Sequence, residues 1–364
     1  MPTILRALLL IGSIAAQIPP AAAQDMLDLF AYRGVKVDRS ASSANVARRL
    51  ALEDAQRIAF EGLIAKLASE DSAARLPPPD PALLQGLVRS VDIREEKSSA
   101  TRYIATLDVA FNPEAVRNLF RTHGVLYTES GAGRWLLLPL LESEGRTVLL
   151  GPHDWRLAVE KAARGNRLIA PVLPGDDLRA RSRLDATAVS YADSAALAAL
   201  AGDFDAAKTV RLSVRLGLDR LSGREQADWR LDIAPLAPAE TRLFRAEEGS
   251  LLAEAGESRA ALLARLAERL LRRLDEAWKS RMLVAADTLT ERHFTVTTET
   301  LGQWIALRRR LESVALVRAV EIERIGLPTS ALSVQTLGDE EQFDLSLASA
   351  RLKRNGDRLA LADR

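Results

Sequence analysis

The chain has 364 residues, of which 48% are hydrophobic and 27% charged, and it contains no cysteine. At about 100 to 200 residues per domain, this length predicts two or three domains, and the hydrophobic fraction excludes a disordered or fibrous chain. Without cysteine there is no disulfide, thiol nucleophile or cysteine-type zinc site. His123, His153 and His293 stand far apart, so we expect no metal site and no cofactor. The 50 basic and 49 acidic residues balance, which argues against a nucleic-acid partner.

Residues 1–24 have the features of a secretory signal peptide. A single charge, Arg6, precedes the apolar run from Ala7 to Ile18, and small residues follow a proline pair. We expect cleavage near Ala23 or Gln24 and a periplasmic location. An uncleaved anchor is the less favoured alternative, because the run is shorter than the roughly 20 residues that span a bilayer. No later segment is long and apolar enough, so we predict a soluble mature chain without a transmembrane segment.

Residues 25–127 are expected to form an N-terminal α+β module. The patterns predict, in order, a strand at 29–38, a helix at 46–67, strands at 88–95 and 103–111, and a helix at 113–120. In the long helix, apolar and small residues recur at steps of three and four. The second strand of the pair alternates strictly, as a half-buried antiparallel strand does. The proline-rich segment from Leu76 to Pro81 is predicted to be a loop.

Residues 134–240 are expected to form a middle α/β module. We predict strands at 135–141, 147–150, 168–173, 209–216 and 229–233, and helices at 155–164 and 195–200. The first three strands are apolar enough to be interior, and the last two should form a hairpin. Alternating strands and helices favour a mixed sheet.

Pro174, Gly175, Asp176 and Asp177 follow a predicted strand and form the most chemically suggestive group in the chain. Adjacent carboxylates at the end of a strand can hold a cation or serve as an acid–base pair. Proline, glycine and aspartate are also the residues that turns require, and Asp177 is placed to cap a following helix. We favour the turn, predict no catalytic residue, and keep Asp176 and Asp177 as candidate binding residues.

The segment from Arg164 to Leu178 has an Arg-Gly pair before an apolar strand that ends in proline and acidic residues. In this it resembles the bacterial domain of unknown function 2066 family. Val37-Asp38, the alanine-rich helix at 46–67, and the strand at 103–111 with Asn112-Pro113 after it resemble the amino-terminal part of that family. The resemblance implies a secreted, soluble envelope protein and supplies no activity, cofactor or catalytic residue. Arg164, in the Arg-Gly pair, is the third candidate binding residue.

Residues 241–284 are predicted to be a linker and an amphipathic helix. Glu240 to Glu257 is mostly polar or small and is interpreted as a hinge, and Ser258 can cap the helix that follows. The helix has an apolar stripe made of Leu262, Leu263, Leu266, Leu270, Leu274 and Trp278. The arginines on its other face would suit an anionic membrane. Acidic residues dilute that charge, so we favour packing of the stripe on neighbouring domains.

Residues 285–364 are expected to form a C-terminal module. We predict strands at 293–298, 318–325, 331–337 and 358–361, and helices at 301–311 and 340–352. This βαββαβ order is the ferredoxin-like signature. The triplet Arg308-Arg309-Arg310 would suit phosphate or nucleic acid, but no aromatic residue accompanies it, and we favour a solvated helix edge. The fold class predicted is α+β, with two or three small mixed modules in series after a cleaved signal peptide.

The function classes are separated by what the sequence lacks. It contains no nucleophile elbow, phosphate-binding loop, dinucleotide fingerprint or zincin motif. We therefore expect a non-enzymatic binding or assembly factor whose partner is an envelope protein or a cell-wall component. The alternative is a hydrolase or glycan-processing enzyme that uses Asp176 and Asp177, although acid–base catalysis needs two carboxyl groups in different environments. Solute binding between modules is a third possibility, which depends on a pocket.

Overall fold

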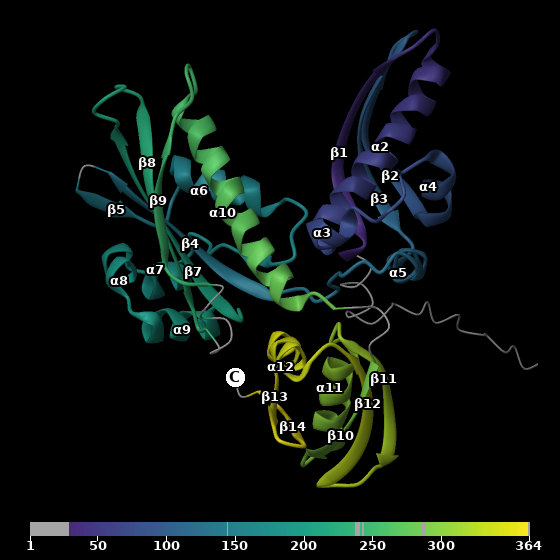
Figure 1. Ribbon diagram of the computed structural model, residues 1–364. Helices are drawn as coiled ribbons and strands as arrows, with labels where there is room; N and C mark the ends of the chain where they lie inside the picture. The colour runs from purple at the N-terminus through teal and green to yellow at the C-terminus, as the bar shows by residue number, and fades with distance from the viewer. Residues whose placement is uncertain (1–28, 144, 237–240, 242–243, 285–288, 363–364) are drawn as a thin grey trace, which may run out of the picture.

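The computed structural model describes residues 29–143, 145–236, 241, 244–284 and 289–362. Within these residues the chain has a mixed α+β fold made of three units, which follow one another along the chain from purple to yellow in Figure 1. The predicted signal peptide lies outside the described residues. None of the helices in the described part combines the length and the hydrophobicity that a bilayer crossing requires.

The N-terminal unit is a helix-covered antiparallel sheet. Its elements are β1 (Ala31–Ser40), α2 (Ala44–Leu67), α3 (Glu70–Ala73), α4 (Pro81–Leu87), β2 (Val88–Ser98), β3 (Arg102–Phe111) and α5 (Pro113–Thr122). The strands lie in the order β1-β3-β2, and α2 packs on one face of the sheet. The helix begins at Ser43, whose side chain accepts a hydrogen bond from the amide of Val46. Ala47, Ala51 and Ala55 are fully buried, so small side chains let α2 lie close to the sheet.

Two short helices in this unit were not predicted. The chain enters α4 at Pro81, inside the predicted loop, because the Asp80 side chain accepts a hydrogen bond from the amide of Leu83 at 2.8 Å. Proline has no amide hydrogen to satisfy and is tolerated in the first turn of a helix. The other predicted strands and helices of this unit are confirmed.

The middle unit is a mixed sheet with helices on both faces. Its elements are β4 (Arg134–Ser143), β5 (Arg146–Val148), α6 (Asp154–Ala163), β6 (Ala170–Val172), α7 (Leu178–Arg183), α8 (Ala186–Tyr191), α9 (Ser194–Asp203), β7 (Lys208–Leu218), β8 (Glu225–Ala234), β9 (Glu247–Leu252) and α10 (Arg259–Met282). The order is β5-β4-β7-β8-β9, with β6 paired to β4. Trp135 and Leu137 belong to the core shared with α6 and α10. Leu136 and Leu138 belong to the core shared with α7, α8 and α9, so alternate residues of β4 contribute to the two faces of the sheet.

The predicted hairpin, β7 with β8, is confirmed, but the predicted hinge is wrong over Glu247–Leu252. These residues form β9, which pairs antiparallel with β8 and brings α10 directly onto the sheet. The strands predicted at 147–150 and 168–173 are shorter than expected and lie along the open edge of β4. Val148 is 39% exposed there, so β5 is not an interior strand.

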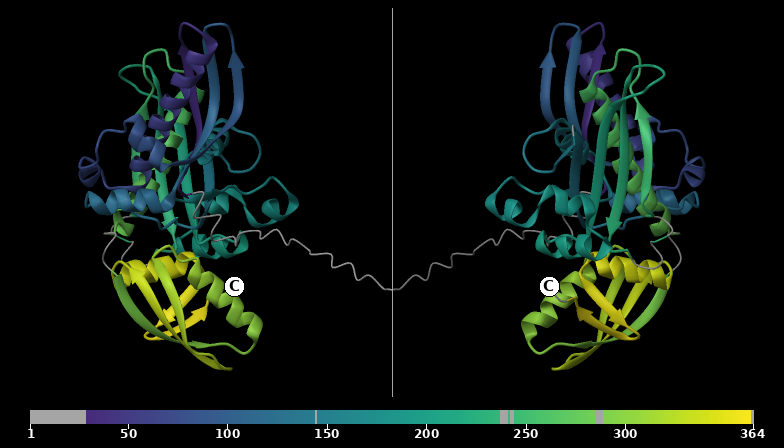
Figure 2. Two further views of the ribbon diagram at one scale, coloured as in Figure 1. Left: turned by 90° about the vertical axis from the view of Figure 1, so that its right-hand side faces the viewer. Right: turned by 90° about the vertical axis from the view of Figure 1, so that its left-hand side faces the viewer.

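The C-terminal unit has a hydrophobic core of its own. Its elements are β10 (Leu289–Thr297), α11 (Leu301–Glu312), β11 (Val317–Arg324), β12 (Thr329–Leu337), α12 (Glu340–Ser349), β13 (Leu352–Asn355) and β14 (Arg358–Leu361). The sheet order is β11-β12-β10-β14-β13. The predicted helix at 340–352 ends three residues early, and β13 was not predicted. It forms a hairpin with β14, which runs parallel to β10. Figure 2 shows this unit at the lower end of the molecule in both views.

The three units meet at the segment that follows α5. Tyr127 forms backbone bridges to Ala68, at the end of α2, and to Val284, which follows α10. Trp278 of α10 donates its indole N–H to the carbonyl of Ser130 at 2.7 Å. Gln342 of α12 donates to the carbonyl of Leu283 at 2.9 Å. The apolar stripe of α10 is buried, as predicted. Within the middle unit α10 packs on α6, β8 and β9, and it also contacts α2 of the N-terminal unit and accepts a hydrogen bond from Gln342 of the C-terminal unit at the carbonyl of Arg281.

Candidate functional site

The structure places Asp176 and Asp177 in a turn, where each has a structural partner. The Asp177 side chain accepts a hydrogen bond from the amide of Ala180 at 2.8 Å and caps α7. The Asp176 carboxylate receives two hydrogen bonds from Arg181, at 2.9 and 3.0 Å. These bonds lower the pKa of Asp176, which keeps the carboxylate ionised. A general acid needs the opposite shift, so this turn does not have the arrangement of an acid–base pair.

Arg164 lies away from that turn, at the C-terminal end of α6. Its side chain is exposed and makes no hydrogen bond or ion pair with the described residues. The next arginine, Arg167, has a different environment. Its side chain is 6% exposed, and its guanidinium lies 2.5 Å from Glu268 and 3.3 Å from Asp275, both in α10. Arg167 therefore fixes the segment after α6 to α10, whereas Arg164 is available to a ligand.

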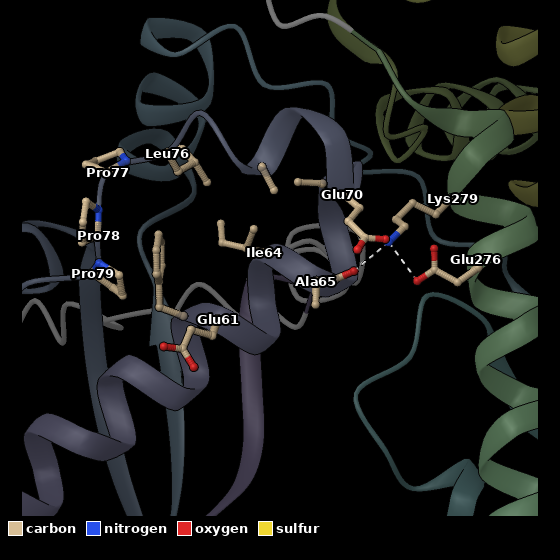
Figure 3. A pocket seen from close by; sticks show the side chains of 13 residues that line it. Glu61, Ile64, Ala65, Glu70, Leu76, Pro77, Pro78, Pro79, Glu276 and Lys279 are labelled. Carbon is tan, nitrogen blue, oxygen red and sulfur yellow. Dashed lines mark hydrogen bonds and ion pairs between the residues drawn. The ribbon is translucent and has the colours of Figure 1, made fainter.

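A groove of about 570 Å³ lies between the N-terminal unit and α10 (Figure 3). We call it the acidic groove. Its lining residues are Phe60, Glu61, Ile64, Ala65, Ala68, Glu70, Ala73, Leu76, Pro77, Pro78, Pro79, Glu276 and Lys279. They come from α2, α3, the proline-rich loop and α10, and so from segments about 200 residues apart in the sequence. The groove exists because α10 lies beside the C-terminal end of α2.

The walls of the acidic groove are apolar and stiff. Phe60 and Ala68 are almost fully buried at its base, and Ile64 is half-buried. Pro77, Pro78 and Pro79 form the wall opposite α10 (Figure 3). Each proline ring fixes φ and removes a backbone donor. This wall therefore offers apolar contact and carbonyl oxygens, with little conformational freedom to lose on binding.

Lys279 closes the α10 side of the acidic groove. The residue is 6% exposed, and its ammonium donates to the carbonyl of Ala65 at 2.7 Å and to Glu276 at 2.9 Å (Figure 3). A buried ammonium needs such partners, because its desolvation is otherwise costly. The lysine therefore ties α10 to α2, and its charge is already balanced by Glu276.

The rim of the groove is negative. Glu61 pairs with Arg57 at 3.0 Å, outside the groove. Glu70, at the start of α3, is exposed and has no hydrogen bond or ion pair with the described residues. The lining contains three carboxylates, those of Glu61, Glu70 and Glu276, and one ammonium, that of Lys279. Its net charge is therefore −2. Among the described residues, no cluster of three or more histidine or acidic side chains is placed to hold a metal ion.

A second cavity, of about 550 Å³, lies where the three units meet. We call it the junction cavity. It is lined by Leu29, Ala31, Arg33, Lys66, Glu129, Ser130, Gly131, Gly133, Arg134, Arg164, Gly165, Asn166, Arg167, Leu168, Ile169, Ala170, Ser313, Val314, Ala315, Ser346, Ser349 and Ala350. Of the three predicted binding residues, Arg164 lines a cavity, whereas Asp176 and Asp177 line neither this one nor the acidic groove.

The comparisons with known proteins add no family to this description. No family model matches the chain, and no curated protein matches it.

Sequence reasoning missed the acidic groove. The sequence predicts the prolines only as a loop, and its patterns single out neither Glu61 nor Lys279. A triple proline beside a long amphipathic helix was the available signal, because it predicts a rigid wall. Nothing in the sequence indicates that α10 provides the opposite wall.

Proposed function

We propose that the protein is a non-enzymatic binding or assembly factor that docks a partner polypeptide in the acidic groove. The segment we expect there combines apolar side chains with lysine or arginine. The observation that carries this proposal is an apolar groove whose described lining carries a net charge of −2.

Charge complementarity supports a basic segment. Opposite charges across an interface steer the partner and reject segments of the wrong sign. Glu70 is the carboxylate with no described partner, so an incoming cation can pair with it without breaking an existing contact. Glu61 and Glu276 keep Arg57 and Lys279 as partners and add to the negative potential.

The rigidity of the walls supports a preformed binding site. Phe60 is held in the core, and Lys279 fixes α10 against α2 by its bond to Ala65. A preorganised surface loses less conformational entropy when it binds. The volume lies within the roughly 300 to 1,000 Å³ of typical ligand pockets, which suits a few side chains of an extended or helical segment.

The location and class of the partner belong to the same proposal. We propose that the chain is exported to the periplasm after cleavage of residues 1–24, and that the partner is an envelope protein or a cell-wall component. The resemblance to the domain of unknown function 2066 family motivates this location. We also propose that the C-terminal unit is a ferredoxin-like variant whose β13–β14 hairpin takes the place of the fourth strand.

Site-specific photo-crosslinking tests the docking proposal. Ala65 lines the groove and is exposed, so a photoreactive amino acid placed there, in cells that produce the protein, should form a covalent adduct. Leu221, 98% exposed in the β7–β8 turn, is the control position and should give none. Mass spectrometry should find lysine or arginine next to apolar residues in the crosslinked segment.

Charge reversal makes the experiment specific. Glu70→Lys should abolish the Ala65 adduct, whereas Glu299→Lys should preserve it, because Glu299 is exposed outside the groove. Equal adducts at Ala65 and Leu221, an acidic crosslinked segment, or an adduct that survives Glu70→Lys would each contradict the proposal.

A further inference from the structure

We propose that the junction cavity is a second binding site, which takes a small molecule with a carboxylate or phosphate group on an apolar body. It is separate from the acidic groove and does not depend on the docking of a polypeptide. Three observations support it: the excess of basic residues in the lining, the lack of a described partner for the Arg164 side chain, and the hydrogen bonds of Asn166 that connect two units beside the cavity.

The described lining of the cavity is strongly basic. Its cations are Arg33, Lys66, Arg134, Arg164 and Arg167, and its one anion is Glu129. The Glu129 side chain is 1% exposed, and its carboxylate is bound by Arg117 and Arg318, which do not line the cavity. Glu129 is therefore neutralised by arginines outside the lining. Arg134 and Arg167 are likewise paired with acidic residues outside it, whereas Arg164 has no partner among the described residues.

Arg164 is the group that an anion can reach without displacing an existing partner. Arg167 is balanced by Glu268 and Asp275, and Arg134 lies 3.1 Å from Asp205. The Arg164 guanidinium is exposed and makes no hydrogen bond or ion pair with the described residues. A guanidinium presents a planar fork of N–H donors that matches carboxylate and phosphate. Arg164 lies at the C-terminal end of α6, where a positive charge also interacts favourably with the helix dipole. That interaction does not explain why the residue lines a cavity.

The rest of the lining suits an apolar body. Leu168 and Ile169 are 4% and 2% exposed, and Val314 of the C-terminal unit is 2% exposed. Ala31 and Ala350 add small apolar surfaces from β1 and from the end of α12. A molecule that places its anion at Arg164 can therefore bury its remainder among residues of all three units.

The side chain of Asn166, which lines the cavity, connects the middle unit to the backbone of the N-terminal unit. Asn166 accepts the amide hydrogen of Arg33 at 2.8 Å and donates to the carbonyl of the same residue at 3.0 Å. This pair of bonds fixes the start of β1 beside Arg164. Ligand pockets of this size occur preferentially at domain interfaces. A preformed cavity also lowers the entropic cost of binding.

Binding of two aromatic anions to the purified protein tests the inference. Phenyl phosphate and benzoate carry the two anion types on the same ring, and benzyl alcohol is their neutral counterpart. We expect saturable binding of one or both anions by calorimetry, with a raised Tm, since a ligand of the folded state stabilises it. Binding of phenyl phosphate alone would identify a phosphate ligand, and binding of benzoate alone a carboxylate. Benzyl alcohol should not bind.

Variants locate the bound anion. Arg164→Gln should weaken binding by about tenfold or more, because hydrogen bonds to charged groups are lost. Arg164→Lys should restore part of the affinity. Arg220→Gln, an exposed arginine in the β7–β8 turn without a described partner, is the matched control and should have no effect. Glu70→Lys, in the acidic groove, should also leave anion binding unchanged.

Three results would overturn the inference: no saturable binding of either anion, equal binding of benzyl alcohol, or unchanged affinity in Arg164→Gln. Each can occur whether or not a polypeptide docks in the acidic groove, so the two proposals succeed or fail separately.

Discussion

Arg117 and Glu129 form a two-point ion pair, in which Nε and Nη2 of the arginine lie 2.7 and 2.6 Å from the two carboxylate oxygens. Arg117 belongs to α5 of the N-terminal unit. Arg318, in β11 of the C-terminal unit, lies 3.4 Å from the same carboxylate. The Glu129 side chain is 1% exposed, so one buried carboxylate links the two units at the edge of the junction cavity.

Loss of this carboxylate should be strongly destabilising. Glu129→Ala leaves two arginines without their buried partner, and we expect a loss of about 3 to 5 kcal/mol in the free energy of unfolding. Glu114→Ala is the matched control, because Glu114 pairs with the same Arg117 while its side chain is 80% exposed. That variant should lose at most about 1 kcal/mol. Urea denaturation measures the free energy of unfolding of both variants. Equal decreases would show that Glu129 does not link the two units.

Stability should depend on pH through His153. Its Nδ1 accepts the amide hydrogen of Arg156 at 3.2 Å and caps α6, and its Nε2 lies 3.4 Å from the carbonyl of Leu149. This geometry fits the neutral ring with the proton on Nε2. Burial lowers the pKa of His153 below its ordinary value of about 6.5.

The sign of this dependence follows from proton binding. Between the lowered pKa of the folded state and about 6.5, the unfolded chain binds a proton that the folded chain does not. The contribution of His153 is therefore complete above about pH 6.5 and is lost as the pH falls through the folded-state pKa. His153→Ser keeps a capping oxygen and does not titrate. Melts from pH 7.5 to 5 should show a larger loss in the wild type than in this variant, and parallel curves would refute the assignment.

The predictable parts of the fold are those whose pattern is complete within one segment. The alanines of α2 recur at steps of four, and the alternation from Tyr103 to Phe111 defines β3, so both elements were found from the sequence. In contrast, Glu247–Leu252 has no alternation of its own. It is a strand because β8 offers it an open edge, and that information lies in another segment.

The sites show the same limit more strongly. The capping role of Asp177 was predictable, because a cap depends on the next few residues. The acidic groove joins Glu70 to Glu276, and the junction cavity joins Arg33 to Arg164 and Val314. These neighbours are set by how α10 and the segment after α5 pack, which short-range patterns do not encode.

Two glycines should respond oppositely to alanine. Gly338 has a φ of +78°, and a Cβ there would lie 2.5 Å from Oε1 of Gln342, which accepts the amide hydrogen of Asp339 in the capping box of α12. Gly338→Ala should therefore cost more than about 1 kcal/mol. Gly86, in α4, has no atom within 4 Å of an added Cβ. Gly86→Ala should stabilise the protein by about 0.4 to 1 kcal/mol, and thermal melts of both variants test the pair.

The turn at Asp176 and Asp177 should behave as a structural element. Asp177→Ala should cost about 0.5 to 2 kcal/mol through loss of the α7 cap. Asp193→Ala is the matched control. Asp193 caps α9 through the amide of Ala196 at the same 2.8 Å, so loss of an ordinary cap there should cost a similar free energy of unfolding. The double variant Asp176→Asn with Asp177→Asn keeps a capping oxygen and should stay folded with little loss. A calcium-dependent rise in Tm that only the wild type shows would instead place a cation at these carboxylates.

The C-terminal unit should fold as an isolated fragment of residues 285–364. Its core is separate from those of the other units and consists of Phe294, Val296, Trp304, Leu307, Leu311, Val314, Val317, Leu332, Val334, Phe343, Leu347, Leu352 and Leu359. Its contacts with the rest of the chain are partly polar, as in the bonds from Gln342 to Leu283 and between Ser346 and Ser130. They also include Leu316, Leu337 and Leu345, which belong to the core of the other units. In the fragment, water can satisfy the exposed polar groups. The three leucines become exposed, but they are not members of the separate core, so that core should survive.

A variant inside this core shows whether the isolated fragment has the native packing. Phe343 is fully buried and stacks on Phe294, with the ring centres 5.7 Å apart. Phe343→Ala should cost about 3 to 5 kcal/mol, which is enough to abolish the melt of a unit this small. We expect a cooperative circular dichroism melt for the fragment and none for the variant. A fragment that melts without cooperativity, or a variant that melts like the parent fragment, would mean that the C-terminal unit depends on α10 and α5 for its structure.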